Sequence, residues 1–249
     1  MAPEASHSTD RLAGRVALVT GASSGIGRAI ALGLARHGAH LCVVGRNSIG
    51  LAETAAAART CSEVKEFQLD LTVEEQLRPL VQFIEKTCCR LDILIHAAAV
   101  IRNARMECAR IDDLDLQYAT NVRAPYMLTQ RLLPLLTTSQ GHIVFINSSV
   151  GLSAQGHAVG QYSATKHALK AVADNLREEV NPIGIRVLTV YPGRTATPMQ
   201  EAIHKQEGRA YLPEALLQPE DVASVVLQAL MLPSTAEVTD ISIRPMRKP

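Results

Sequence analysis

The chain has 249 residues, of which 47% are hydrophobic and 20% are charged, a balance that is typical of a globular protein with a large core. Lysine and arginine total 25 against 24 acidic residues, so the formal net charge is +1. This near-neutral balance excludes the strongly basic surface with which proteins bind nucleic acid or anionic membranes. The apolar runs are all shorter than the roughly 18 residues that span a bilayer, so we expect no membrane span.

The five cysteines are odd in number and have no metal-ligand spacing, which argues against a secreted disulfide framework and against a metal site. We therefore expect a reducing compartment and a cytoplasmic protein. Residues 1–12 contain Pro, Glu, Ser and Asp but no apolar core, so they are interpreted as a short disordered lead rather than a signal peptide or anchor. Because no linker or low-complexity segment follows, residues 13–249 are predicted to form a single domain.

Short β-rich runs alternate with longer helical patterns along the rest of the chain. Strands are predicted at residues 15–20, 40–44, 64–69, 91–96, 141–147, 185–191 and 238–244. Helices are predicted near residues 25–37, 48–59, 73–88, 112–138, 160–181 and 219–231. This alternation predicts an α/β fold, a Rossmann-type doubly wound parallel sheet of about seven strands with helices on both faces, in three layers α/β/α. Residues 192–217 are too long and irregular for an ordinary connection and are interpreted as a functional lid.

A glycine-rich turn follows the first predicted strand in "VALVTGASSGIGRAI". Gly21, Gly25 and Gly27 would let the backbone approach a ligand closely, and the helix that begins here would present unpaired N–H groups and its positive dipole end to a phosphate. Ser23 and Ser24 add hydroxyl donors. A tight strand-to-helix turn without a ligand would look similar, but the order of first strand, glycine turn and helix favours a dinucleotide site.

The end of the second predicted strand, "VVGRN", indicates which dinucleotide binds. An acidic residue at this position would bind the adenosine ribose 2′-OH, but the chain has Gly45 and then Arg46. A guanidinium suits a 2′-phosphate, so NADP(H) is favoured over NAD(H). A surface arginine without a ligand is the alternative.

The stretch "GQYSATKHALKAVADNL" places Tyr162 and Lys166 four residues apart, and therefore on one face of the predicted helix. Both residue types are common on helix surfaces, so a structural role is possible on this stretch alone. The functional interpretation is that the phenol transfers a proton when a carbonyl is reduced or an alcohol is oxidised, while the nearby ammonium lowers the pKa of the phenol.

Taken together, "TGASSGIG", "NSSVG", "YSATK" and "YPGRTATP" resemble the short-chain dehydrogenase/reductase family from about residue 12 to residue 244. The resemblance implies hydride transfer between a nicotinamide and a carbonyl or secondary alcohol, with catalytic roles for Tyr162, Lys166, Asn121 and a serine after the fifth strand. It also implies a homodimer or homotetramer. A catalytically silent dinucleotide-binding redox sensor is the alternative function.

The catalytic serine has two candidates. The family's usual spacing to the tyrosine gives Ser149, whereas alignment from the strand end gives Ser148, which we favour because strand register is fixed and loops accept insertions. His96-Ala97-Ala98-Ala99 replaces the family's Asn-Asn-Ala-Gly, and His96 is interpreted as a packed strand-end residue. The resemblance extends the cofactor contacts to Gly21, Ser23, Ser24, Gly25, Ile26, Gly27, Arg46, Asp70, Leu71, Ala97, Asn121, Tyr162, Lys166, Pro192, Gly193, Thr195 and Thr197.

Overall fold

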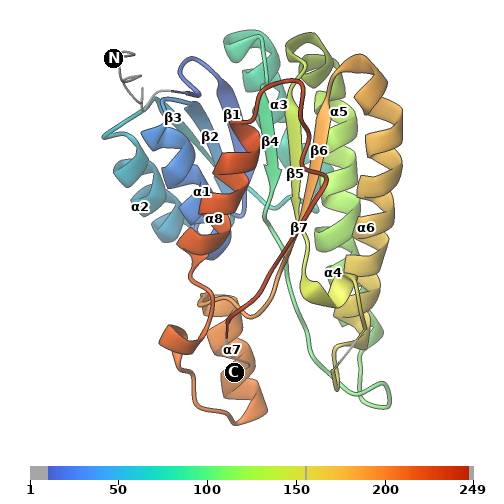
Figure 1. Cartoon of the computed structure of the whole chain (residues 1–249). Coiled ribbons are helices and arrows are strands. Elements are labelled where there is room, and N and C mark those ends of the chain that lie inside the picture. Colours follow the sequence, from blue (N-terminus) through green and yellow to red (C-terminus); the bar gives the residue numbers. More distant parts are fainter. Residues whose placement is uncertain (1–10, 155, 247–249) are drawn as a thin grey trace, which may run out of the picture.

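The computed structural model describes residues 11–154 and 156–246. Seven parallel strands form one sheet in the order β3-β2-β1-β4-β5-β6-β7 (Figure 1). The strands are β1 (Val16–Thr20), β2 (His40–Gly45), β3 (Val64–Gln68), β4 (Ile93–His96), β5 (His142–Ile146), β6 (Arg186–Pro192) and β7 (Asp240–Ile243). All seven predicted strands are confirmed. The strand order reverses between β1 and β4, the point at which ligands bind in open α/β sheets.

Helices cover both faces of the sheet, as predicted (Figure 1). The helices are α1 (Gly25–Arg36), α2 (Ser48–Ala58), α3 (Glu74–Phe83), α4 (Ile111–Tyr118), α5 (Ala124–Ser139), α6 (Gly160–Val180), α7 (Pro198–Glu207) and α8 (Pro219–Leu230). Helices α1, α2 and α8 share one hydrophobic cluster with the sheet, and α3, α5 and α6 share the other. Within the described residues, none of the helices has the length and apolarity that a membrane crossing requires.

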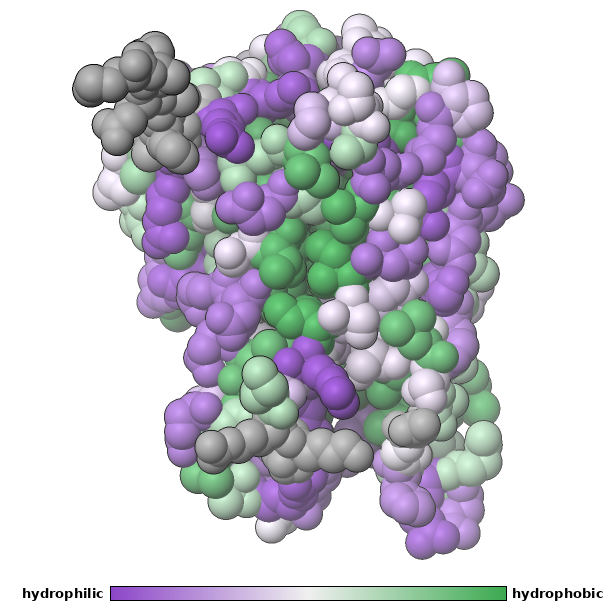
Figure 2. Space-filling view, viewed as in Figure 1, coloured by the Kyte–Doolittle hydropathy of each residue, from purple (hydrophilic) through white to green (hydrophobic). Residues whose placement is uncertain are grey.

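Successive residues of each central strand enter opposite clusters. In β1, Ala17 and Val19 pack toward α1 and α8, while Val16 and Leu18 pack toward the opposite helices. Because both faces are covered, the strand is buried throughout, and its sequence is a continuous apolar run rather than an alternating one. The edge strand β7 is less covered, and Figure 2 shows a band of apolar side chains between it and α8.

The structure corrects the predictions for three parts of the chain: the N-terminal lead, two of the helices and the lid. Of the predicted disordered lead, residues 1–10 lie outside the described residues, but Leu12 is buried and its N–H donates to the carbonyl of His37 at 3.0 Å. The predicted helices 73–88 and 112–138 each contain a π-helical turn, Ile84–Cys88 and Ala119–Arg123.

The third correction concerns the predicted irregular lid at residues 192–217. It contains the regular helix α7, because Thr197 accepts a hydrogen bond from the N–H of Gln200 and Pro198 occupies the first helical position. Figure 1 shows α7 beyond the carboxyl ends of the strands, set apart from the layered body.

The first helix packs against the glycine turn without room for a side chain. A Cβ on Gly27 would lie 2.3 Å from the carbonyl oxygen of Gly21. We expect Gly27→Ala to lower the free energy of unfolding by about 1–3 kcal/mol, because α1 must move away from the turn. Urea denaturation measures the change. Gly160→Ala is the matched control, since a Cβ at this helical position meets nothing within 4 Å; equal losses for both variants would contradict the packing argument.

Candidate active site

A cleft of about 310 Å³ opens at the carboxyl ends of the central strands. Its walls include thirteen of the predicted site residues: Gly21, Ser23, Ser24, Gly25, Ile26, Gly27, Arg46, Asp70, Leu71, Ala97, Tyr162, Lys166 and Thr197. The glycine turn, the end of β2 and the start of α6 are therefore brought together around one space, although they are far apart in the sequence. The walls do not include five other predicted residues, Asn121, Ser148, Pro192, Gly193 and Thr195.

The glycine turn has the backbone geometry that a phosphate site needs. Gly21 has φ 68°, and a Cβ there would lie 2.6 Å from the backbone nitrogen of Ala98. Gly25 has φ 54° and begins α1. Ser24 occupies the N-cap position in extended conformation, but its side chain makes no capping hydrogen bond. The first N–H groups of α1 thus remain available to a ligand in the cleft.

Arg46 and Asp70 lie together at one end of the cleft. An Arg46 nitrogen is 4.0 Å from Oδ2 of Asp70, and the two side chains are 56% and 35% exposed. Burial tends to raise the pKa of Asp70, but hydrogen bonds from the N–H and hydroxyl of Thr72 and the charge of Arg46 outweigh it and lower the pKa. At Gly45 a Cβ would lie 3.1 Å from Oγ of Ser23, so an acidic side chain at this strand end would crowd the glycine turn.

Tyr162 and Lys166 lie in the first two turns of α6 and are 8% and 1% exposed. The Nζ of Lys166 donates to the carbonyl of Ile146 at 3.0 Å and lies 5.6 Å from the centroid of the Tyr162 ring. Burial lowers the pKa of Lys166 to about 7. Both side chains face the cleft, as the helical spacing predicted.

The pKa of Tyr162 differs from the prediction. Burial raises it to about 12, and a side-chain hydrogen bond with Ser148 acts in the opposite direction. The sequence predicted that the Lys166 ammonium would lower the pKa of Tyr162, but Lys166 does not contribute to this shift. The physical reason is that desolvation of the phenol dominates, while Lys166 is itself so buried that its charged form is disfavoured near neutral pH.

The two candidate serines occupy different environments. Ser148 lies just after β5, forms a side-chain hydrogen bond with Tyr162 and accepts a hydrogen bond from the N–H of Val150 at 3.4 Å. Ser149 begins the following 3-10 turn and is exposed. The structure therefore brings Ser148, rather than Ser149, to the phenol.

Asn121 lies in the π-helical turn between α4 and α5 and is 1% exposed. Its side chain accepts from the N–H of Val100 and donates to the carbonyl of Val100, both at 2.9 Å, and also donates to Oγ1 of Thr165 at 3.1 Å. Pro125 has no N–H to donate to the carbonyl of Asn121, its α-helical partner, so this carbonyl is left for another donor. π-Helical turns are often found at functional sites.

The residues that replace the family's Asn-Asn-Ala-Gly are accommodated without strain. His96 is buried, hydrogen-bonds Oγ1 of Thr129 at 2.8 Å and stacks on Phe145, which confirms its interpretation as a packed strand-end residue. Burial lowers its pKa to about 3, so it is neutral at physiological pH. In the described chain the non-glycine residues with positive φ are Cys89, Gln140 and Ala158, so alanine at position 99 needs no strained backbone.

Sequence reasoning missed several wall residues: Val44, Gly45, Asn47, Leu69, Ala98, Ala99, Thr120, Ile146, Asn147, Pro198 and Met199. Two of them carry buried oxygens that have no hydrogen-bond partner among the described residues, Oγ1 of Thr120 and Oδ1 of Asn147. Oδ1 of Asn147 packs against Gly151, where an added Cβ would lie 2.4 Å from it, so Oγ1 of Thr120 is the better candidate for pairing with a polar ligand, since buried polar atoms are nearly always paired. Their only sequence signal was adjacency to Asn121 and Ser148.

The comparisons with known proteins agree with this geometry. The family model described as short chain dehydrogenase matches residues 15–208. The chain belongs to the short-chain dehydrogenase family. An uncharacterized oxidoreductase from Staphylococcus aureus (strain MW2) is 31% identical over 236 residues, which cover 94% of this chain and 99% of the relative.

Solved structures of this family are also similar. A Shigella flexneri protein described as a short-chain dehydrogenase, complexed with NADP, has a TM-score of 0.84 and 32% identity, covering 94% of this chain and 98% of its own. A short-chain dehydrogenase from Burkholderia cenocepacia J2315 in complex with NADP has a TM-score of 0.82 and 27% identity, with coverages of 94% and 97%. This short-chain dehydrogenase is accordingly an oxidoreductase with a Rossmann-like fold.

The buried lysine makes the stability of this short-chain dehydrogenase depend on pH. Burial lowers the pKa of Lys166 from 10.5 to about 7, so between these values the unfolded chain binds a proton that the folded chain lacks. Stability from this group therefore rises with pH across the window, by up to about 1.4 kcal/mol per unit. We expect Lys166→Met to be stabilised relative to wild type most strongly at pH 7, and progressively less toward pH 10.

Urea denaturation at several pH values measures this difference. Lys170→Met is the control, because Lys170 lies on the same helix with a side chain that is 37% exposed. Its difference from wild type should stay nearly constant across the window. Parallel pH profiles for wild type and Lys166→Met would show that Lys166 is not held neutral by burial.

Proposed function

We propose that this protein is an NADP(H)-dependent oxidoreductase that interconverts a carbonyl and a secondary alcohol. The observation that carries the proposal is the joint placement of Tyr162, Lys166 and the glycine turn around one cleft, with Ser148 hydrogen-bonded to the phenol. A proton donor and a phosphate cradle in one space are the parts that hydride transfer from a dinucleotide to a carbonyl requires.

The residues of the cleft fit a phosphorylated dinucleotide. The glycine turn and the uncapped start of α1 would hold the pyrophosphate, and Arg46 would hold the 2′-phosphate, with Asp70 beside the adenine. The unpaired hydroxyl oxygen of Thr120 would pair with a polar group nearer the nicotinamide. Structures of relatives in complex with NADP support this choice. NADP(H) would supply the hydride in reduction and accept it in oxidation.

Each catalytic side chain would have a separate task. The raised pKa keeps Tyr162 protonated at neutral pH, so the phenol would donate a proton to the substrate oxygen as charge develops there. Ser148, which is hydrogen-bonded to the phenol, would orient the substrate oxygen. Lys166 would bind the ribose and assist the phenol, and Asn121 would support Lys166 through water.

We further propose that residues 13–249 act as one domain and that the protein is cytoplasmic, as the lack of a linker and the cysteine pattern indicate. On the resemblance to the family, the enzyme would be a homodimer or homotetramer. Its partner would be a small carbonyl or alcohol.

Removal of the phenolic hydroxyl tests the function. We expect Tyr162→Phe to lower kcat by about 10²–10⁴-fold with NADPH and a panel of ketones and aldehydes, because no other group replaces the proton donor. NADPH binding, followed by fluorescence titration, should change little. Tyr126→Phe is the control, since Tyr126 is 55% exposed on α5. Unchanged turnover in Tyr162→Phe would remove tyrosine as the acid, whereas tight NADPH binding without any wild-type turnover would favour the redox sensor.

The two serines provide an internal comparison in the same assay. Ser148→Ala should lose turnover because its hydroxyl reaches the phenol, and Ser149→Ala should resemble wild type because its side chain is exposed. The reverse order would assign the substrate contact to Ser149.

Cofactor preference tests the role of Arg46. We expect Arg46→Ala to weaken NADPH binding by about 10- to 100-fold, the range for loss of hydrogen bonds to a charged group, and to leave NADH binding nearly unchanged. Fluorescence titration with both dinucleotides measures this. Arg59→Ala, which removes a guanidinium paired with Glu66 at the end of α2, is the control. Tighter binding of NADH than of NADPH by wild type would overturn the assignment of NADP(H).

A further inference from the structure

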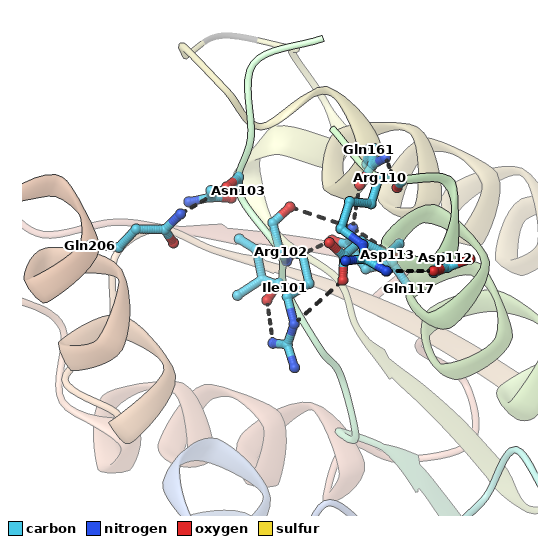
Figure 3. A network of polar contacts seen from close by, with 9 residues as sticks. All are labelled: Ile101, Arg102, Asn103, Arg110, Asp112, Asp113, Gln117, Gln161 and Gln206. Carbon is cyan, nitrogen blue, oxygen red and sulfur yellow. Dashed lines mark hydrogen bonds and ion pairs between the residues drawn. The ribbon is translucent and has the colours of Figure 1, made fainter. Parts of the chain in front are cut away.

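A glutamine on α4 is buried where an apolar side chain would serve for packing. Gln117 is 0% exposed, and its Oε1 accepts the N–H of Arg102 at 3.0 Å (Figure 3). Its Nε2 donates to Oε1 of Gln161 at 3.1 Å and to the carbonyl of Asp113 at 3.0 Å, and also lies 3.5 Å from the carbonyl of Arg102. One amide therefore joins α4, α6 and the loop that follows β4.

This loop is held at both ends. Gln161 donates in turn to the carbonyl of Arg110 at 2.8 Å, so the Gln117–Gln161 pair fixes both ends of residues 102–110. From the other side, Gln206 of α7 donates to the carbonyl of Asn103 at 2.8 Å (Figure 3). The loop after β4 and the helix of the lid are thus in direct contact.

The network lies next to the catalytic groups in the sequence and in space. Gln161 immediately precedes Tyr162, and Gln117 lies one helical turn before Asn121. Asn121 fixes Val100 through both of its backbone groups, and Gln117 fixes Arg102 two residues later. The loop that starts at the cleft wall, Ala97 to Ala99, is therefore anchored twice to the same helix.

The chemistry of these contacts favours positioning over packing. A buried amide is tolerated only when its donors and acceptor are paired, and each partner here is directional. Leucine would fill the same volume but would leave the N–H of Arg102 and Oε1 of Gln161 without their partner. The arrangement specifies where the loop lies relative to Tyr162, which apolar packing alone would not do.

We propose that Gln117 is a positioning residue for the substrate: it holds the loop of residues 100–110 at a fixed place beside Tyr162 and, through Asn103, gives α7 a docking point over the cleft. The substrate part of this inference rests on the proposed function. Gln117 would touch neither the substrate nor the cofactor and would act through the loop.

Hydrogen exchange and kinetics on Gln117→Leu test the proposal together. Exchange of peptides that cover residues 100–110 should become about 10-fold faster, because the N–H of Arg102 loses its acceptor, while peptides from β1 and β5 keep their protection. The KM for the best carbonyl should rise about 10-fold with a much smaller fall in kcat, and the Kd for NADPH should stay within about twofold. Gln82→Leu, at an exposed position of α3, is the matched control.

Two further variants keep the test decisive. Gln161→Leu breaks the same link from α6 and should give the same KM change if Gln117→Leu does not fold. Gln206→Leu, on the exposed side of α7, should raise KM by about threefold without altering exchange at the Gln117 contacts. Exchange and KM values equal to those of Gln82→Leu would overturn the proposal. If wild type reduces no carbonyl, the proposed function fails, and hydrogen exchange alone still decides whether Gln117 anchors the loop.

Discussion

The properties of the whole site depend on the burial of one amine, the side chain of Lys166. Lys166 is 1% exposed and keeps its nitrogen on the carbonyl of Ile146, at the end of β5. A lysine at this depth destabilises the fold, because its charge is removed from water and no acidic side chain of residues 11–154 or 156–246 pairs with it. Such residues are concentrated at functional sites, where a shifted pKa serves chemistry. The same burial that lowers the pKa of Lys166 raises that of Tyr162, so the unusual properties of both groups have one physical cause.

Much of the fold and part of the site follow from local sequence. The five inner strands β1, β2, β4, β5 and β6 could be predicted because strands buried on both faces are largely apolar runs. The glycine turn could be predicted because Gly21, Gly25 and Gly27 occupy backbone positions that side chains would obstruct. The pair Tyr162 and Lys166 could be predicted because helical spacing alone places them on one face. Each of these patterns lies within a short stretch of consecutive residues.

The remaining features depend on contacts between distant segments. No local pattern indicates that Thr120 and Asn147 contribute to the cleft wall, since this depends on how the π-helical turn after α4 and the end of β5 are placed around the same space. Pro125 favours the π-helical turn at Asn121. The paired hydrogen bonds from Asn121 to Val100 also favour it, and Val100 lies in the distant loop after β4. The pKa of Tyr162 was predicted in the wrong direction because spacing gives proximity to a cation but not burial.

The backbone contact that supports the glycine turn has a consequence for how the protein folds. Gly21 rests against the backbone of Ala98, a contact that exists only once β4 has paired with β1. The hydrogen bond between Thr20 and Ile95 at this junction spans 75 positions of sequence, and closing so long a loop is entropically costly and slow. An N-terminal fragment that ends before β4 would contain every glycine of the turn yet lack its support. Nucleotide affinity would then arise late during folding and would report that the central strands have assembled.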